Sequence, residues 1–264
     1  MTLPNYSNSK TSAFILCAGS GERWNNYLGM PKQHIKFANE TLLERTVRLL
    51  INTKKDIGIY IVTNDKRLEQ LGCNVIVPVS FDLTIHSFLG TQPYWSENNI
   101  VLLGDVFYSN RSIAILTRQI QEIHFFGKVG RSKFGKKSHG EIYAFVFDRG
   151  NQNVIAKGVE NILAYTNKGG IGNLWDLYHH LAQLPYNSGR VERNIFQLLN
   201  DYTDDFDTPE DYNLTKGYYQ IIAGPFTIKK LALLCFLKIS EWINNWHARR
   251  FKGYQKDHWE FAAK

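Results

Sequence analysis

The sequence has few cysteines, no long apolar run and no apolar leader at its start. Cys17, Cys73 and Cys235 lie far apart and form no Cys-x-x-Cys pair, a pattern typical of buried thiols in a reducing compartment. The longest apolar stretch, Leu231–Leu237, is too short to span a bilayer, and the polar start MTLPNYSNSKTS has no signal core. These absences predict a cytoplasmic protein.

Several motifs that would assign a function on their own are missing as well. The eight histidines show no metal-ligand spacing, and no Gly-Lys-Ser/Thr opens a helix as in a P-loop. Basic and aromatic residues do not alternate as in a platform for single-stranded nucleic acid, and no recognition-helix pattern is present. The net charge of +7 therefore indicates a small anionic partner rather than nucleic acid.

Short apolar runs alternate with segments of helical period from residue 13 onward. This alternation predicts an α/β fold with a mainly parallel mixed sheet flanked by helices, and a ligand site at the carboxyl ends of the strands. The expected strands are Ala13–Cys17, Ile57–Val62, Asn74–Val79, Asn99–Leu103, Ile123–Val129 and Gly140–Phe147, with 203–207 as a short strand or turn. The expected helices are Thr41–Ile51, 65–72, 82–91, 154–166, 174–184 and 208–222. At 264 residues the chain is long enough for one large domain, here 1–224, with an appendage.

That appendage, residues 225–264, is predicted to be an amphipathic helical extension. Apolar residues recur there at steps of three or four, and the basic stretch ARRFKGYQK follows. Packing on the domain or on a second subunit in a homodimer is the favoured interpretation. Contact with an anionic membrane is the alternative. The members of the stripe are Ile228, Leu231, Cys235, Ile239, Trp242 and Trp246, widened by Leu234, Phe236 and Ile243.

The most informative stretch is CAGSGER, which follows the first expected strand. Gly19 and Gly21 stand where the backbone turns, so a ligand can come close to the N–H groups of Ala18, Gly19, Ser20 and Gly21. Arg23 adds a forked donor that suits phosphate oxygens, and Lys32 follows Pro31 as a second cation. The stretch therefore predicts a phosphate-binding loop, with an ordinary strand-to-helix turn as the alternative.

Three segments in the same order resemble nucleotidyltransferases that share a Rossmann-like fold with A-type glycosyltransferases. LCAGSGERWNNYLGMPKQ, followed by NETLLERTVRLL, is similar to the phosphate loop and Pro-Lys pair of that family, and most similar to methylerythritol phosphate cytidylyltransferases. VLLGDVFYSN resembles the strand that ends in a metal-binding Asp. DFDTPEDY resembles an element of the molybdenum cofactor branch. The segments span residues 13 to 220.

The resemblance implies a magnesium-dependent nucleotidyltransferase that releases pyrophosphate. Cys17 replaces the usual Ala, and Gly104-Asp105-Val106-Phe107 stands where the methylerythritol branch has His-Asp-Ala-Ala-Arg-Pro. The expected acceptor is therefore a small phosphate or phosphonate ester, such as a phosphosugar or phosphocholine, and CTP is the preferred triphosphate. An A-type glycosyltransferase that uses an NDP-sugar and a non-catalytic nucleotide-binding module are the alternatives. The absence of an Asp-x-Asp motif after the fourth strand argues against the glycosyltransferase.

The same resemblance assigns roles to individual residues. Arg23 and Lys32 would hold the triphosphate and neutralise the charge of the reaction, with Lys32 near the α-phosphate. Asp105 and Asp207 are the expected Mg²⁺ ligands, with Asp205 in reserve. Asp105 could instead be a turn residue, and Asp207 a helix N-cap.

Other polar and aromatic residues have open roles. Trp24 and Tyr27 either stack on the base or cover the core. A basic loop either clamps an acidic acceptor or is solvated, and its residues are Lys128, Arg131, Lys133, Lys136 and Lys137.

Overall fold

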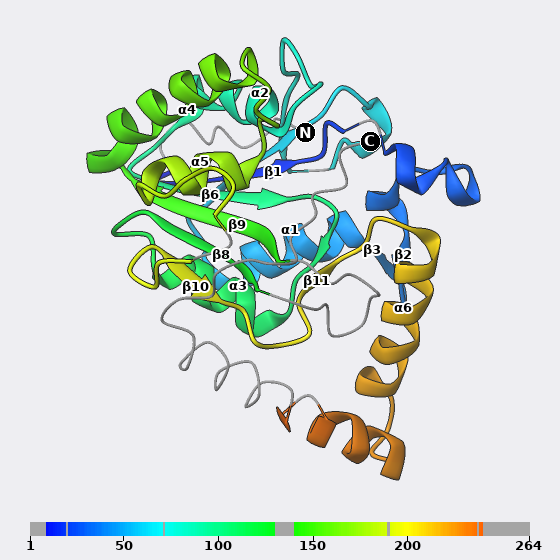
Figure 1. Cartoon of the computed structure of the whole chain (residues 1–264). Helices are drawn as coiled ribbons and strands as arrows, with labels where there is room; N and C mark the ends of the chain where they lie inside the picture. The colour runs from blue at the N-terminus through cyan, green and yellow to red at the C-terminus, as the bar shows by residue number, and fades with distance from the viewer. Residues whose placement is uncertain are drawn as a thin grey trace.

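A central sheet forms the body of the protein (Figure 1). The computed structural model describes residues 9–19, 21–70, 72–129, 140–188, 191–236 and 238–239. Seven strands lie in the order β10-β8-β9-β6-β1-β4-β5. Their bounds are β1 Thr11–Leu16, β4 Gly58–Val62, β5 Asn74–Ile76, β6 Asn98–Leu103, β8 His124–Lys128, β9 Glu141–Asp148 and β10 Phe196–Leu198.

The sheet is mixed and mainly parallel. Strand β1 pairs in parallel with both β4 and β6, β4 with β5, and β8 with β10. Strand β9 runs antiparallel to both of its neighbours, β6 and β8. The fold class predicted from the sequence is thus confirmed. In such a sheet the parallel strands deliver their carboxyl ends to one edge.

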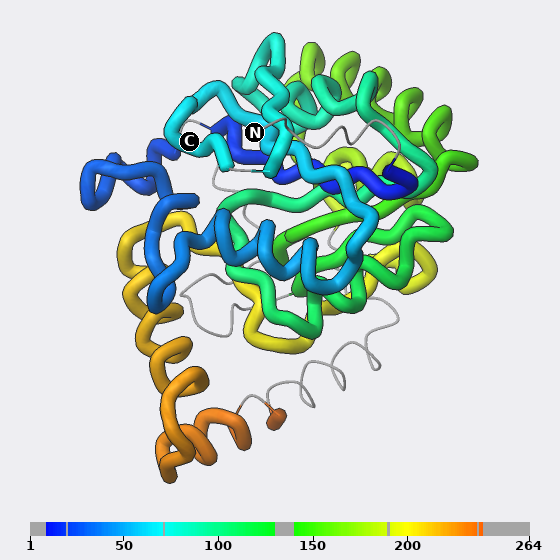
Figure 2. Tube along the Cα trace, turned by 180° about the vertical axis from the view of Figure 1, so that it is seen from behind, coloured from blue at the N-terminus to red at the C-terminus, as the bar shows by residue number. Residues whose placement is uncertain are grey.

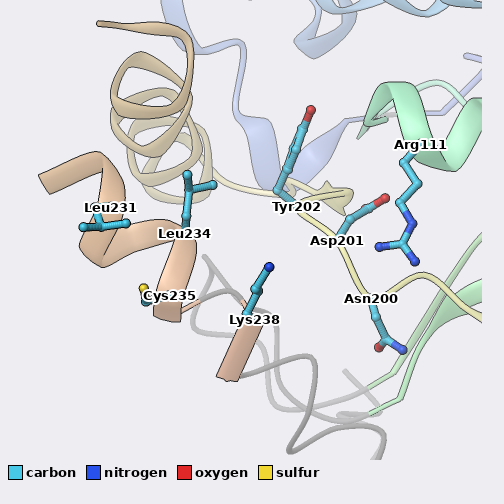
Figure 3. Close-up of a pocket in the computed structure, with 8 residues that line it drawn as sticks. All are labelled: Arg111, Asn200, Asp201, Tyr202, Leu231, Leu234, Cys235 and Lys238. Atoms are coloured by element: carbon cyan, nitrogen blue, oxygen red, sulfur yellow. The ribbon is translucent and has the colours of Figure 1, made fainter. Parts of the chain in front are cut away.

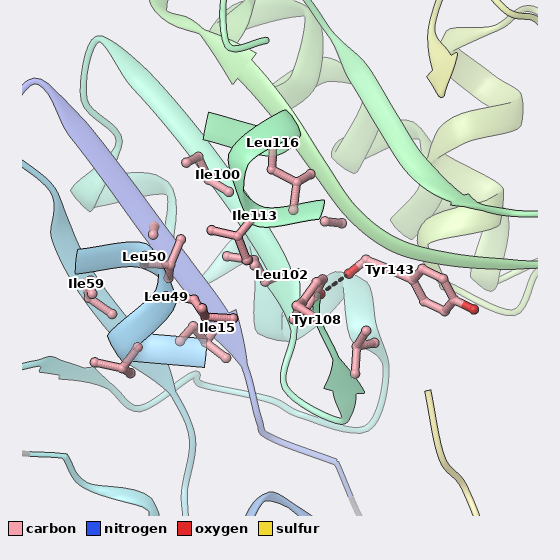
Figure 4. Close-up of a cluster of buried hydrophobic side chains, with 14 of the residues drawn as sticks. Ile15, Leu49, Leu50, Ile59, Ile100, Leu102, Tyr108, Ile113, Leu116 and Tyr143 are labelled. Atoms are coloured by element: carbon pink, nitrogen blue, oxygen red, sulfur yellow. Dashed lines mark hydrogen bonds between the residues drawn. The ribbon is translucent and has the colours of Figure 1, made fainter. Parts of the chain in front are cut away.

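Alternation along the strands assigns each helix to a face. Ala13 and Ile15 of β1 join a buried cluster with α1 (Leu42–Thr53) and α3 (Asn110–Arg118), shown in Figure 4. Phe14 and Leu16 face the opposite cluster. That second cluster contains α2 (Thr84–Leu89), α4 (Gln152–Thr166) and α5 (Leu174–Leu181). Figure 2 shows α1 and α3 from their own side. Side chains at odd and even positions of a strand point to opposite faces, so both faces are buried.

A smaller apolar cluster connects the sheet to α6 (Pro209–Ala223). Phe37 is fully buried in it and contacts Phe107, Phe206 and Tyr212. Two short ribbons frame this cluster: β2 (Lys36–Phe37) pairs with β3 (Glu40–Thr41), and β7 (Val106–Phe107) with β11 (Asp204–Asp205). The β7–β11 ribbon brings a late part of the chain to the end of β6.

Several elements differ from the sequence expectation. Residues 65–72 were expected to form a helix, but Asp65 accepts a hydrogen bond from Arg67 N and, among the described residues of this stretch, only the 3₁₀ turn η5 (Lys66–Leu68) forms. Strand β10 and helix α3 were not expected. Ser109 caps α3 by accepting a hydrogen bond from Ser112 N.

The chain continues beyond α6 as a further helix over 228–236. None of the helices within the described ranges combines the length and the apolar content that crossing a bilayer requires. The boundary between a domain of 1–224 and an extension of 225–264 remains a prediction. Trp242, Ile243 and Trp246 of the expected stripe lie outside the described residues.

Candidate active site

The candidate site starts where β1 and β6 end side by side. Their register pairs Leu16 with Leu103, so Cys17 and Gly104 follow at the same edge. Gly104 N donates to Leu16 O at 2.9 Å, and a Cβ on Gly104 would come within 2.4 Å of Cys17 Sγ. Only glycine fits this contact without displacing a neighbour. The close packing fixes the position of Asp105.

The loop after β1 is open toward solvent and has unusual backbone angles. Gly21 has φ +62°, and a Cβ on Gly19 or Gly21 would meet nothing within 4 Å. Further along, Asn25, Asn26 and Leu28 also have positive φ, between 47° and 59°. Such conformations cost free energy and recur at ligand sites. Ser20, a predicted phosphate-binding residue, lies outside the described residues.

Trp24 anchors this loop to the core. Its side chain is buried, and its Nε1 donates to Met30 O at 2.9 Å. The ring contacts Tyr27 and Tyr212 edge-on. Of the two roles considered from the sequence, Trp24 therefore has the structural one, covering the core.

Lys32 lies between two carboxylates. Its Nζ is 2.7 Å from Asp105 Oδ2 and 3.7 Å from Asp207 Oδ1. The Lys32 side chain is only 14 % exposed. Burial alone would lower the pKa of Lys32, but the carboxylates of Asp105 and Asp207 outweigh it, so the pKa lies above its ordinary value. Lys32 is therefore a permanent cation at neutral pH.

Arg23 reaches the same carboxylate pair from the solvent side. Its guanidinium is 2.5 Å from Asp207 Oδ2, and its side chain is 70 % exposed. Asp207 precedes α6, where Thr208 and Asp211 form a capping box, and Asp207 N donates to Asp211 Oδ2. The cap of α6 thereby holds the backbone of Asp207. The structure thus brings together Arg23, Lys32, Asp105 and Asp207, which come from three separate segments.

A second buried pair lies next to this cluster. Lys128 Nζ, at the end of β8, contacts Asp204 Oδ1 at 2.5 Å and Asp205 Oδ1 at 3.7 Å. The hydroxyl of Tyr143 donates to Asp204 Oδ1 at 2.8 Å. Burial, with a contribution from Asp204, raises the pKa of Tyr143 well above its ordinary value, so the hydroxyl remains a donor.

The contacts of this second pair also distinguish Asp207 from Asp205, the two candidates for the second metal ligand. Asp207 contacts Lys32, whereas Asp205 faces Lys128. Sequence reasoning did not single out Tyr143 or Asp204, because neither stands in a motif. Arg131, Lys133, Lys136 and Lys137 of the expected basic loop lie outside the described residues.

The carboxylates fit a divalent ion that is shared with a ligand. Asp105 and Asp207 point at one ammonium group, so both can face one cation. Among the described residues no group of three or more His, Cys, Asp or Glu side chains could hold a metal. Two carboxylates suit Mg²⁺, which takes its other ligands from phosphates and water. The metal assignment of Asp105 and Asp207 remains a prediction.

Cys17 at the same edge is not a nucleophile. Burial raises the pKa of its thiol, and the Asp105 carboxylate adds to the rise. Since a thiolate is the reactive form of cysteine, this side chain serves packing.

Comparison with solved structures identifies the fold. CTP:phosphocholine cytidylyltransferase from Streptococcus pneumoniae superimposes with a TM-score of 0.54 at 14% identity, over 79% of this chain and 98% of that one. The chain has a nucleotidyltransferase fold. A Bacillus anthracis protein assigned as a glucose-1-phosphate thymidylyltransferase gives a TM-score of 0.54 at 11% identity, over 82% of this chain and 97% of that one.

Comparisons of the whole sequence with known proteins find no match. No family model matches the chain, and no curated protein is significantly similar to it. In the nucleotidyltransferase fold of this chain, the Arg23, Lys32, Asp105 and Asp207 cluster lies after strands β1, β6 and β11.

Proposed function

We propose that the protein is a magnesium-dependent nucleotidyltransferase that couples a nucleoside triphosphate to a small phosphate or phosphonate ester and releases pyrophosphate. The observation that carries the proposal is the placement of Lys32 between Asp105 and Asp207, with Arg23 beside them. CTP is the first triphosphate to test, because a neighbour in structure is by name a CTP-dependent cytidylyltransferase and the Pro31-Lys32-Gln33 run is similar to cytidylyltransferases.

The reaction joins two anions, so charge neutralisation and positioning supply most of the catalysis. An oxygen of the acceptor attacks the α-phosphorus, a new P–O bond forms, and the bond to the bridging oxygen breaks so that pyrophosphate leaves. The backbone N–H groups of Gly19 and Gly21 and the Arg23 guanidinium would hold the outer phosphates. Lys32 would neutralise the α-phosphate as attack proceeds. A Mg²⁺ held by Asp105 and Asp207 would supply further neutralisation when bound.

Lys128 would be the cation that meets the acceptor. It lies at the end of β8, where Asp204 holds its ammonium group. Acceptor phosphate and nucleotide would then contact different lysines of the same sheet edge, Lys128 and Lys32.

The test is a screen for pyrophosphate release. Each of the four triphosphates is mixed with Mg²⁺ and a panel of phosphate and phosphonate esters, and we expect release that requires both a triphosphate and an acceptor. Asp105→Asn should abolish it, with an unchanged melting temperature. Release from no combination, or full activity of the Asp105→Asn variant, would contradict the proposal. Release of NDP from an NDP-sugar, measured in a separate assay, would favour the glycosyltransferase alternative.

A further inference from the structure

The segment after α6 carries an apolar face that the described part of the protein leaves uncovered. Phe226 is 73% exposed and Ile228 86%, and along the helix that follows Phe236 is 53% and Ile239 57% exposed. The segment lies at the far end of α6, away from the sheet (Figures 1 and 2). Exposed apolar residues that share one helix face indicate an interaction surface.

One side of this helix is turned to the protein, but it meets little apolar surface there. Leu233 is buried, whereas Leu231, Leu234, Cys235 and Lys238 line a cavity of about 340 Å³. The opposite wall of this cavity contains Arg111, Asn200, Asp201 and Tyr202, as Figure 3 shows. Three of those four residues are polar or charged. This wall of the cavity therefore offers little apolar surface to match the helix.

Charge distinguishes the partners that could cover the apolar face. Residues 225–239 contain Lys229, Lys230 and Lys238 and no Asp or Glu. At 3.6 residues per turn, Ile228, Cys235 and Ile239 share a stripe. Lys229 lies on the exposed flank of this stripe, whereas Lys238 lies on the flank that lines the cavity. A lysine along the edge of an apolar face can extend its ammonium group toward anionic headgroups while its stem covers apolar surface.

We propose that residues 225–239 form an interfacial helix that docks on an anionic lipid surface. A second copy fits less well. A pair of copies would bring the three lysines of each segment together, and residues 225–239 contain no acidic side chain to offset their charge. On a membrane the same lysines meet phosphate groups. This inference does not depend on the catalytic activity.

The first experiment uses the full-length protein and vesicles. Flotation is compared between vesicles of phosphatidylcholine alone and vesicles that also contain phosphatidylglycerol. We expect binding to the anionic vesicles at low salt, at least about tenfold weaker binding to the neutral ones, and release of the protein at about 0.5 M NaCl.

The second experiment changes the face without disturbing the core. Ile228→Asp and Phe236→Asp alter exposed side chains and should each weaken vesicle binding at least about tenfold, because a charge replaces inserted apolar surface. Lys229→Gln should weaken binding to anionic vesicles roughly fivefold. The control is Val154→Asp, which changes a 49% exposed residue of α4 and should leave binding unchanged. Melting temperatures verify that each variant is folded.

Three results would overturn the proposal. They are absence of binding to anionic vesicles at low salt, equal loss of binding in the Val154→Asp control, and full binding by the Phe236→Asp variant. Light scattering adds an independent readout. If the protein does not bind vesicles but forms a dimer that Phe236→Asp dissociates, the apolar face is assigned to a second copy.

Discussion

Lys32 is the residue on which the two acidic side chains of the site converge. Its ammonium group is nearly enclosed and contacts both Asp105 and Asp207. Arg23 contacts only the outer side of the pair and is mostly exposed. A buried, fixed charge stabilises a transition state more than an exposed one, because it needs no reorganisation as the reaction proceeds. The two cations should therefore differ in kinetic effect.

The first prediction distinguishes the kinetic roles of Lys32 and Arg23. Lys32→Ala should lower kcat at least about 100-fold with a small change in KM for the triphosphate. Arg23→Ala should mainly raise KM, by roughly tenfold, because its guanidinium is expected to hold outer phosphates. Steady-state kinetics of pyrophosphate release measure both. Equal changes in kcat for the two variants would contradict the assignment of Lys32 to the α-phosphate.

The packing around position 104 requires a glycine. Gly104→Ala should destabilise the protein by about 1–3 kcal/mol, because the new Cβ would approach Cys17 Sγ to 2.4 Å and Leu16 O to 2.9 Å. Adding Cys17→Ala should restore part of the loss. In contrast, Gly217→Ala in α6 meets nothing within 4 Å and should stabilise the helix by roughly 0.5–1 kcal/mol. Urea denaturation measures all three, and a neutral Gly104→Ala would refute the close packing at this edge.

At the scale of elements, the start of α6 has two roles. Thr208 Oγ1 accepts from Asp211 N, and the Asp211 carboxylate in turn accepts from Asp207 N. Thr208→Ala should cost about 1 kcal/mol of stability and also lower kcat, because Asp207 is no longer held.

The control for this prediction is the cap of another helix, α5. Asn173 caps α5 by accepting from Asp176 N, so Asn173→Ala should cost a similar free energy and leave kcat unchanged. If both variants lost stability and neither lost activity, the capping box of α6 would have no influence on the site.

The β3–α1 junction contains a pH-dependent contact. Hydrogen bonds from Arg48, joined by those from Arg45, lower the pKa of Glu40 from its ordinary value of 4.5 despite partial burial. The stabilisation is therefore complete above about pH 4.5 and is lost as the pH falls through the lowered pKa. Glu40→Gln should be less stable than the parent at neutral pH, and the difference should shrink in acid.

Denaturation at a series of pH values measures this effect. Glu160→Gln removes an exposed pair with Lys157 and should change stability little at any pH. A constant difference between the parent and Glu40→Gln from neutral pH into acid would contradict the role of the Glu40 carboxylate.

Elements differed in how well the sequence predicted them. Six of the seven strands of the sheet were predicted because continuous apolar runs such as Ala13–Cys17 are bounded by polar turns, whereas the short β10 was missed. Helix α3 was missed because the apolar residues of NRSIAILTR are consecutive and its cap, Ser109, lacks a Glu or Gln three residues later.

The site itself was predicted through motifs, not through spacing. Lys32 and Asp105 lie 73 residues apart, so no local pattern in the sequence links them. Their pairing, like the contact of Lys128 with Asp204, depends on how the strands are ordered in the sheet.

At the scale of the whole molecule, the net charge of +7 should speed the association of an anionic substrate by electrostatic attraction. The Debye length is ~30 Å at 0.01 M salt and ~8 Å at 0.15 M, so salt screens this attraction. We expect kcat/KM for the triphosphate to fall severalfold across this range while the melting temperature changes little. A kcat/KM that is constant in salt would show that only the local cluster acts on the substrate.

The distance along the chain between Arg23 and Asp207, 184 residues, has a consequence for biosynthesis. A ribosome translates most of the message before the β11 segment leaves the exit tunnel, and only then can the last acidic side chain join the others. Until that moment the cluster of Arg23, Lys32, Asp105 and Asp207 is incomplete, so under the proposed function growing chains would not yet catalyse nucleotidyl transfer.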